Sequence, residues 1–181
     1  MLSPYVILPV LVVFLVVWGV PELTFIPGIY LHYPDGPHLL ATLTLSMAVI
    51  LLVVAAWDDA RTRRISNRLT AGIGILALCR LALLGDVTAA SYTAEAALVV
   101  FAIAVALFVL HIIGGGDAKL LTATALVIGY QAVLPFLAIM SICGAALSIV
   151  ILVLHRQTVP YGVAIAAGAI VTLTLQSSII G

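Results

Sequence analysis

Residues 38–57 read HLLATLTLSMAVILLVVAAW, and no Asp, Glu, Lys or Arg interrupts this stretch. As a helix rising ~1.5 Å per residue it would be ~30 Å long, which matches the hydrocarbon core of a bilayer. Backbone N–H and C=O groups inside lipid must find partners within their own segment, which favours a helix. The strict alternation of apolar and polar residues typical of membrane barrel strands does not run through the stretch, because residues 48–57 are all apolar. It therefore predicts a transmembrane helix.

Six similar apolar runs flank this stretch. They cover residues 4–20, 69–85, 93–113, 118–131, 132–154 and 161–180. Over the whole chain 65% of the residues are hydrophobic and 8% are charged, whereas soluble domains carry about 25% charged residues. So little polar surface excludes a water-soluble globule. We expect an all-α fold, a polytopic membrane bundle of about seven transmembrane helices that forms one domain over residues 1–181.

The distribution of charge predicts how the bundle is oriented. Residues 58–68, DDARTRRISNR, hold four of the seven Lys and Arg residues, and short loops rich in these residues stay in the cytoplasm. If the spans alternate, residues 114–119 and 155–160 lie on the same side, which then holds every basic residue except Arg80. This arrangement predicts a cytoplasmic N-terminus and an external C-terminus. It also predicts a true crossing by residues 118–131, although that run would reach only ~21 Å.

Residues 1–37 precede the rest of the bundle and differ from it. The run at 4–20 lacks the basic start of a signal peptide, so we interpret it as an extra, retained N-terminal span. Residues 21–37 are rich in proline and aromatic residues and contain no Lys or Arg, which is typical of an external loop at the membrane surface. Residues 38–181 form the core of the predicted domain.

Several classes of function are disfavoured by composition. The formal net charge is zero, which gives no reason to expect a nucleic-acid partner. The two cysteines, Cys79 and Cys143, lie inside apolar runs without the spacing of metal ligands or of a disulfide framework. We therefore expect no metal site and no cofactor. Ionisable residues at membrane depth remain as the candidates for function, because burying them in lipid is costly.

Asp59 and Asp117 are the most informative of these ionisable residues. Each lies at the end of an apolar run, and the predicted topology places both at the same side of the membrane. Two carboxyl groups brought within a few ångströms share a proton, so that one can activate water while the other protonates a carbonyl oxygen. That is the chemistry of aspartic peptide hydrolysis. Acidic residues at helix ends are also commonly solvated and without a role, and spacing alone leaves both interpretations open.

The residues around Asp117 fit either interpretation. Gly114, Gly115 and Gly116 permit positive φ angles and the close approach of a second backbone, including that of a substrate, but a tight turn between two spans needs glycines equally. Lys119 is expected either to reach lipid headgroups or to keep Asp117 partly ionised.

Three motifs in chain order carry a resemblance to a known family. The segment Asp59-Ala-Arg61-Thr-Arg-Arg-Ile-Ser-Asn67 resembles the D-x-R-x-x-x-I-P-N signature of the prepilin peptidases, and GGGDAKL at residues 114–120 resembles their GxGD motif. Pro160-Tyr-Gly162 resembles their P-Y-G segment. The resemblance covers roughly residues 38–181. It implies six core helices, with the run at 4–20 as an addition.

The resemblance implies a membrane-embedded aspartic endopeptidase, which removes the basic leader peptide of type IV prepilins or pseudopilins at the cytoplasmic face of the cell membrane. Asp59 and Asp117 match the catalytic positions, and Asp58 matches none. Arg61, Asn67, Lys119 and the glycines at 114–116 are expected to support catalysis or substrate binding. The implied partners are the substrate helix, the lipid bilayer and the pilus assembly machinery.

Two departures and two alternatives accompany this interpretation. Ser66 replaces the usual proline of the first motif. The cysteine-bearing domain of the larger, methylating members is not seen, so the chain resembles the short Tad-type or archaeal members, and we expect cleavage without N-methylation. A small proton- or cation-coupled transporter subunit is the main alternative function. A structural scaffold for a pilus machine is another, and it would tolerate loss of both aspartates.

Overall fold

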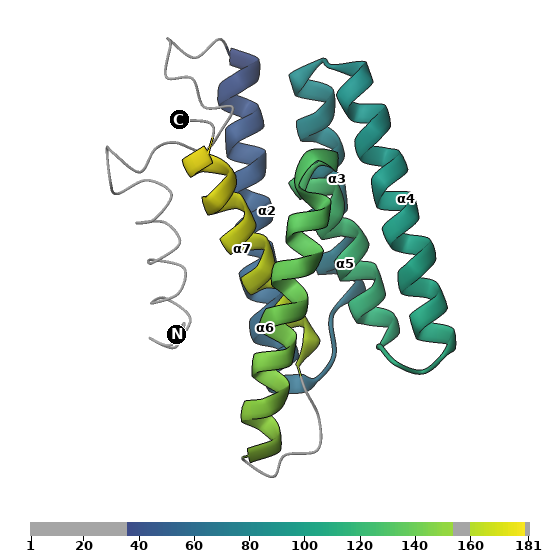
Figure 1. Ribbon diagram of the computed structural model, residues 1–181. Coiled ribbons are helices and arrows are strands. Elements are labelled where there is room, and N and C mark those ends of the chain that lie inside the picture. The colour runs from purple at the N-terminus through teal and green to yellow at the C-terminus, as the bar shows by residue number, and fades with distance from the viewer. Residues whose placement is uncertain (1–35, 154–159, 180–181) are drawn as a thin grey trace, which may run out of the picture.

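The computed structural model describes residues 36–153 and 160–179, and all secondary structure in these ranges is helical (Figure 1). The α-helices are α2 (Gly36–Thr62), α3 (Asn67–Leu84), α4 (Val87–Val109), α5 (Gly115–Ile128), α6 (Val133–Val153) and α7 (Tyr161–Ile179). A single 3-10 turn, η1 (Tyr130–Ala132), joins α5 to α6. The expected all-α bundle is confirmed. The predicted span at 4–20 lies outside the described residues, as does most of the loop at 21–37.

The six apolar runs from residue 38 onward all form helices, but several predicted boundaries differ from the helix ends by three residues or more, most of all in α2 and α4. Helix α2 continues to Thr62, so the polar segment predicted at 58–68 contributes only residues 63–66 to a loop. Asp58, Asp59 and Arg61 are compatible with a helix, which here simply extends past its apolar stretch. Helix α4 begins at Val87 rather than 93, because Asp86 Oδ1 accepts the N–H of Ala89 at 2.9 Å and caps the helix start.

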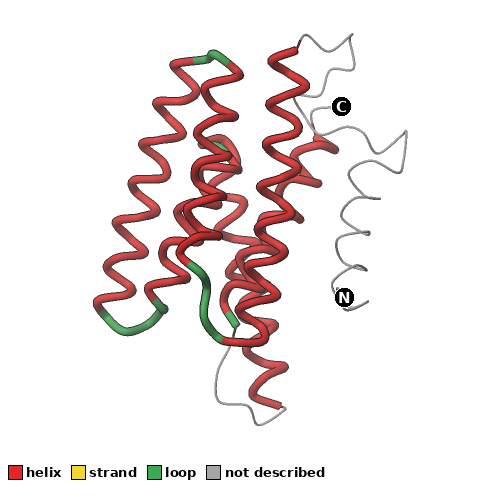
Figure 2. The backbone as a smooth tube through the Cα atoms, turned by 180° about the vertical axis from the view of Figure 1, so that it is seen from behind, coloured by secondary structure: helices red, strands yellow, loops and turns green. Residues whose placement is uncertain are grey.

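Consecutive helices run in opposite directions along the bundle. The α2–α3 loop and the α4–α5 loop lie at the same end, which is the lower end in Figures 1 and 2, and α7 begins there as well. We call this the aspartate end, because it holds Asp59 and Asp117. Helix α5 starts at this end and η1 joins its far end to α6, so α5 does not turn back on itself. The alternation expected from charge is thus reproduced among the described helices.

Four helical segments are long and apolar enough to cross a membrane: Leu39–Thr62, Asn67–Leu84, Val87–Val109 and Tyr130–Val153. The length and composition of these segments are those of a multi-pass membrane protein. Residues Tyr161–Leu175 form a shorter apolar helix, and α5 has only 14 residues. The total of seven crossings remains a prediction.

Helix α5, with only 14 residues, is the central helix of the bundle. It packs against α2, α3, α4, α6 and α7. Most of its side chains are buried, among them Leu120, Thr124 and Val127. A helix surrounded by protein need not match the thickness of the lipid, since its ends are covered by neighbouring helices. Gly129, with a φ of 85°, ends the helix and redirects the chain into η1.

Helices α6 and α7 approach each other closely at Gly168. A Cβ built on Gly168 would lie 2.8 Å from the Cα atom of Met140, so the contact is with backbone and cannot be relieved by a side-chain rotation. Small residues of this kind let membrane helices pack without a gap. A Cβ on Gly144, by comparison, would meet Ala164 at an ordinary 3.7 Å.

We expect Gly168→Ala to destabilise the protein by about 1–3 kcal/mol, the usual cost of overpacking. The measurement is thermal unfolding of the purified protein in detergent. Gly144→Ala is the matched control and should be neutral or stabilising, since alanine favours a helix over glycine. Equal midpoints for the two variants would contradict the close packing of α6 on α7.

Candidate active site

Asp59 lies in the last turn of α2 and is 5% exposed. Its Oδ2 atom accepts a hydrogen bond of 2.8 Å from the backbone N–H of Gly162, the second residue of α7. The first N–H groups of a helix have no partner within the helix and carry partial positive charge. The start of α7 therefore both satisfies and orients the buried carboxylate of Asp59.

Gly162 must be glycine for this contact to form. A Cβ at this position would lie 2.9 Å from the Cβ of Asp59 and 3.0 Å from its Oδ2 atom. The sequence-based set of site residues omits Gly162. The sequence feature that could have identified Gly162 is the Pro160-Tyr161-Gly162 motif at the start of the last apolar run.

Asp117 lies in the first turn of α5, outside the four span-length helices, and is half-buried. Its Oδ2 atom accepts the N–H of Gly114 at 3.2 Å. Burial raises the pKa of Asp117 to about 6, with a further contribution from the negative charge of Asp59, while the hydrogen bond from Gly114 acts in the opposite direction. The charge of Asp59 contributes to the raised pKa of Asp117, which makes the two aspartates candidates for one site.

Asp58 and Asp59 differ in burial. Asp58 is only partly buried, whereas Asp59 is among the few buried polar side chains of the described residues. Neighbouring residues on a helix point about 100° apart, so the two carboxyl groups cannot face the same partner. The contact with Gly162 belongs to Asp59. Geometry therefore favours the residue that the motif spacing selected.

The three glycines before Asp117 permit close approach, but they do not supply positive φ angles. Gly114 has a φ of −75°, and the only described glycines with positive φ are Gly85 and Gly129. The turn before α5 instead uses His111, whose φ is 60°. The positive φ angles that these three glycines permit are therefore not used in this turn.

What the glycines provide is space for the chain's own neighbouring groups. A Cβ on Gly116 would come within 3.3 Å of the Cβ of Ile65, and one on Gly115 within 3.3 Å of the Phe108 ring. A Cβ on Gly114 would lie 2.9 Å from Oδ2 of Asp117. The contact between Gly116 and Ile65 brings the first two sequence motifs together beside the aspartates.

Lys119 supports this junction rather than Asp117. Its Nζ atom donates a hydrogen bond of 2.9 Å to Oδ1 of Asn67, which links the start of α5 to the start of α3. Asn67 and Lys119, both predicted as supporting residues, are thus brought together by the fold.

Arg63, and not the predicted supporting residue Arg61, provides the positive charge near Asp59. The Arg61 guanidinium lies 5.4 Å from the centre of the Trp57 ring, one turn earlier on α2. The positive charge that acts on Asp59 is that of Arg63, which the sequence-based set omits. The φ of Arg63 is 54°, and its N–H donates to the Asp59 carbonyl at 2.9 Å to close the helix. Among the described residues, no group of three or more His, Cys, Asp or Glu side chains is placed to hold a metal ion.

Ser66 has a clear structural role where the family motif has proline. It is the N-cap of α3, and its side-chain oxygen accepts the N–H of Arg68 at 3.3 Å. Its φ of −68° is the value that a proline ring would impose. Serine therefore preserves the backbone path of the loop and adds a cap.

Comparison with protein-family models gives a match over residues 46–149 to the type IV leader peptidase family. The match covers more than half of the chain and includes both aspartates and the segments that meet at Ile65 and Gly116. No curated protein and no solved structure gives a significant match. The chain thus belongs to the type IV leader peptidase family, a family of membrane peptidases.

Proposed function

We propose that this protein is an aspartic endopeptidase that cleaves the basic leader from type IV prepilins or prepilin-like proteins. The observation that carries the proposal is that Asp59 and Asp117, on different helices, lie at the same end of the bundle, where the charge of Asp59 helps to raise the pKa of Asp117. Membership of the peptidase family supports hydrolysis of a peptide bond. The paired carboxyl groups support the aspartic mechanism.

The two aspartates have environments suited to different roles. Asp59 accepts an N–H at the start of α7 and lies near the positive charge of Arg63, two contacts that oppose the unfavourable effect of burying its carboxylate. Asp117 has a raised pKa and is the better candidate for the protonated partner. In this assignment, Asp59 is the general base and Asp117 the general acid.

In the proposed reaction, ionised Asp59 takes a proton from water while the oxygen of that water bonds to the scissile carbonyl carbon. Protonated Asp117 donates its proton to the carbonyl oxygen, which gives a neutral tetrahedral diol. The diol collapses when the C–N bond breaks, one hydroxyl proton returns to Asp117, and the proton on Asp59 passes to the leaving nitrogen. Both aspartates then regain their starting states.

The location of the site suits a substrate that is charged before the cut and apolar after it. The aspartates lie at the end of the bundle that also holds the arginine-rich loop, and we propose that this end faces the cytoplasm of a cell membrane. Cleavage there would separate a leader in the aqueous phase from an apolar helix in the bilayer. We further propose that the product is released without N-methylation, in keeping with the short members that the chain resembles.

The direct test is co-expression with a prepilin whose basic leader ends just before an apolar helix. Loss of the leader mass, with an unmethylated new N-terminus, is the expected result by mass spectrometry. Uptake of protons or cations into vesicles without any cleavage would instead support a transporter. Transporters place their ionisable residues near the bilayer midplane, which differs from the helix-end location of Asp59 and Asp117.

The raised pKa of Asp117 predicts how cleavage depends on pH. A group that must donate a proton is active below its pKa, so the rate should decline as pH rises through about 6. The measurement is kcat/KM for leader cleavage between pH 4.5 and 8.5, a range that brackets this value by roughly two units. A rate that stays constant up to pH 8 would exclude Asp117 as the titrating acid.

A further inference from the structure

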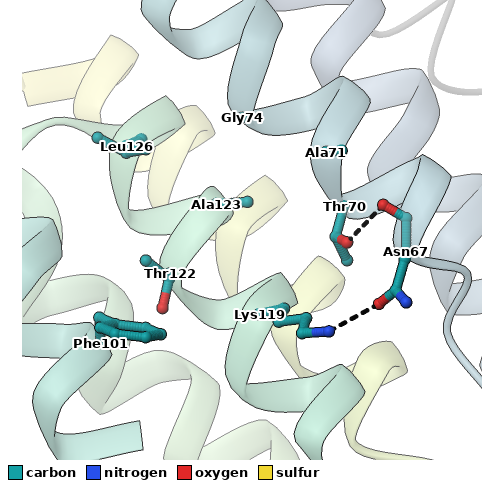
Figure 3. A pocket seen from close by; sticks show the side chains of 9 residues that line it. All are labelled: Asn67, Thr70, Ala71, Gly74, Phe101, Lys119, Thr122, Ala123 and Leu126. Atoms are coloured by element: carbon teal, nitrogen blue, oxygen red, sulfur yellow. Dashed lines mark hydrogen bonds between the residues drawn. The ribbon is translucent and has the colours of Figure 1, made fainter. Parts of the chain in front are cut away.

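An open groove of about 370 Å³ lies between α3, α4 and α5, near the aspartate end (Figure 3). Helix α3 contributes Asn67, Thr70, Ala71 and Gly74, and helix α5 contributes Lys119, Thr122, Ala123 and Leu126. Each set has the i, i+3, i+4, i+7 spacing of a single helix face. Phe101 of α4 lies on the opposite side from α3.

The groove changes in polarity along its length. The Lys119 ammonium and the Asn67 amide mark the end near the start of both helices, and Gly74 and Leu126 lie one to two turns further on. From Lys119 to Leu126 the distance along the axis of α5 is ~10 Å. The groove therefore has a cationic end, followed by an apolar trough that extends into the depth of a bilayer.

The groove is separated from the two aspartates by α5 itself. Residues two apart on a helix point about 200° away from each other, so Lys119 projects from nearly the opposite side of α5 to Asp117. Leu120 and Leu121, which lie on the intervening faces, are buried in the bundle core. A peptide whose scissile bond lies at Asp59 and Asp117 would have to pass around the start of α5 to enter the groove.

The shape of the groove suits a narrow occupant. The groove is open, and its apolar part is lined by Ala71 and Gly74 of α3 and by Ala123 and Leu126 of α5. A lipid acyl chain is a single file of methylene groups and can follow a trough of this width.

The positive charge at one end of the groove favours a lipid with an anionic headgroup. The Lys119 ammonium group has three N–H donors. One binds Asn67, and the other two can bind an anion. Arg64 and Arg68, both exposed, add positive charge at the same end of the bundle. Lysine side chains at this level characteristically reach for the phosphate layer of the membrane.

We propose that the groove between α3 and α5 is a binding site for an anionic phospholipid, with its phosphate at Lys119 and one acyl chain along Ala71, Gly74 and Leu126. The bound phosphate would reinforce the Lys119–Asn67 link between the two motif segments. The proposal is independent of the proposed peptidase activity, because lipid binding is measured without any substrate.

Gly74 gives a direct test, since a Cβ at this position meets nothing within 4 Å and a larger side chain would extend into open space. Gly74→Leu should fill the trough, and Lys119→Met should remove the cation while keeping a similar length. Ala82→Leu is the matched control, because Ala82 is an exposed residue of α3 that does not line the groove.

The experiment is native mass spectrometry of the full-length protein in detergent, with added phosphatidylglycerol or with phosphatidylcholine of the same acyl chains. The wild type and Ala82→Leu should retain phosphatidylglycerol. Gly74→Leu and Lys119→Met should each bind it roughly tenfold more weakly, the expected effect of losing one charged hydrogen bond or a comparable apolar contact. Equal binding of the two lipids by the wild type, or unchanged phosphatidylglycerol binding by Gly74→Leu, would overturn the proposal.

Discussion

Replacing Asp59 or Asp117 by asparagine is expected to reduce leader cleavage by at least ~10²-fold, because each change removes a group that transfers a proton in the reaction. Asparagine keeps the shape of the side chain, and its amide oxygen can still accept the N–H of Gly162 or Gly114. The variants should therefore insert and accumulate normally. The measurement is the fraction of co-expressed prepilin that has lost its leader, normalised to the amount of enzyme in the membrane.

Asp58→Asn is the matched control, since it makes the same chemical change one residue away on the same helix. It should cleave at close to the wild-type rate. Activity lost with Asp58→Asn and kept with Asp59→Asn would shift the assignment by one residue. Full activity in the Asp59→Asn and Asp117→Asn variants together would eliminate the aspartic mechanism and favour a scaffold.

Gly162→Ala is expected to lower kcat for cleavage by roughly 10- to 100-fold, because small misplacements of a catalytic group are costly. The new methyl group would lie 2.9 Å from the Cβ of Asp59 and 3.0 Å from its Oδ2 atom. Either α7 or the carboxylate must then move, and the hydrogen bond of 2.8 Å is lengthened or lost. Gly162 contacts Asp59 rather than the reacting atoms, so we regard it as a positioning residue.

A separate measurement of kcat and KM distinguishes positioning from substrate binding. A positioning role should lower kcat and shift the pH profile, because Asp59 loses the N–H that favours its ionised form. Gly144→Ala is the control, as it adds the same methyl group to a transmembrane helix at an ordinary contact distance of 3.7 Å. Wild-type kinetics in folded Gly162→Ala would show that the contact with Asp59 is not needed.

The helices could be predicted from the sequence because every segment that crosses a bilayer must be apolar and long enough. Runs such as 38–57 and 132–154 need only be apolar and long enough, and the structure places α2 and α6 over them. The ends of the helices followed different rules. The start of α4 depends on the cap at Asp86, and α5 ends at Gly129, whose φ is 85°, among five neighbouring helices. Neither feature is visible in hydropathy.

The candidate site residues that belong to sequence motifs could be predicted. Those selected by the direction in which a helical residue points could not. Asp59, Asp117 and the Asn67–Lys119 pair belong to segments that the motifs marked in advance. Arg61 and Arg63 are only two residues apart, yet about 200° of helical rotation would separate them, and α2 ends between them. The hydrogen bond from Gly162 to Asp59 joins residues 103 positions apart, which no local pattern can reveal.

The hydrogen bond between Gly162 and Asp59 also has a consequence for the synthesis of the protein. Asp59 and Asp117 are both made before the N–H that orients Asp59, which belongs to Gly162 near the start of the last described helix. During synthesis, the nascent chain therefore holds both acidic residues before it holds the donor that orients Asp59. We expect a chain that is interrupted before Gly162 to lack an oriented Asp59 carboxylate and to have little peptidase activity.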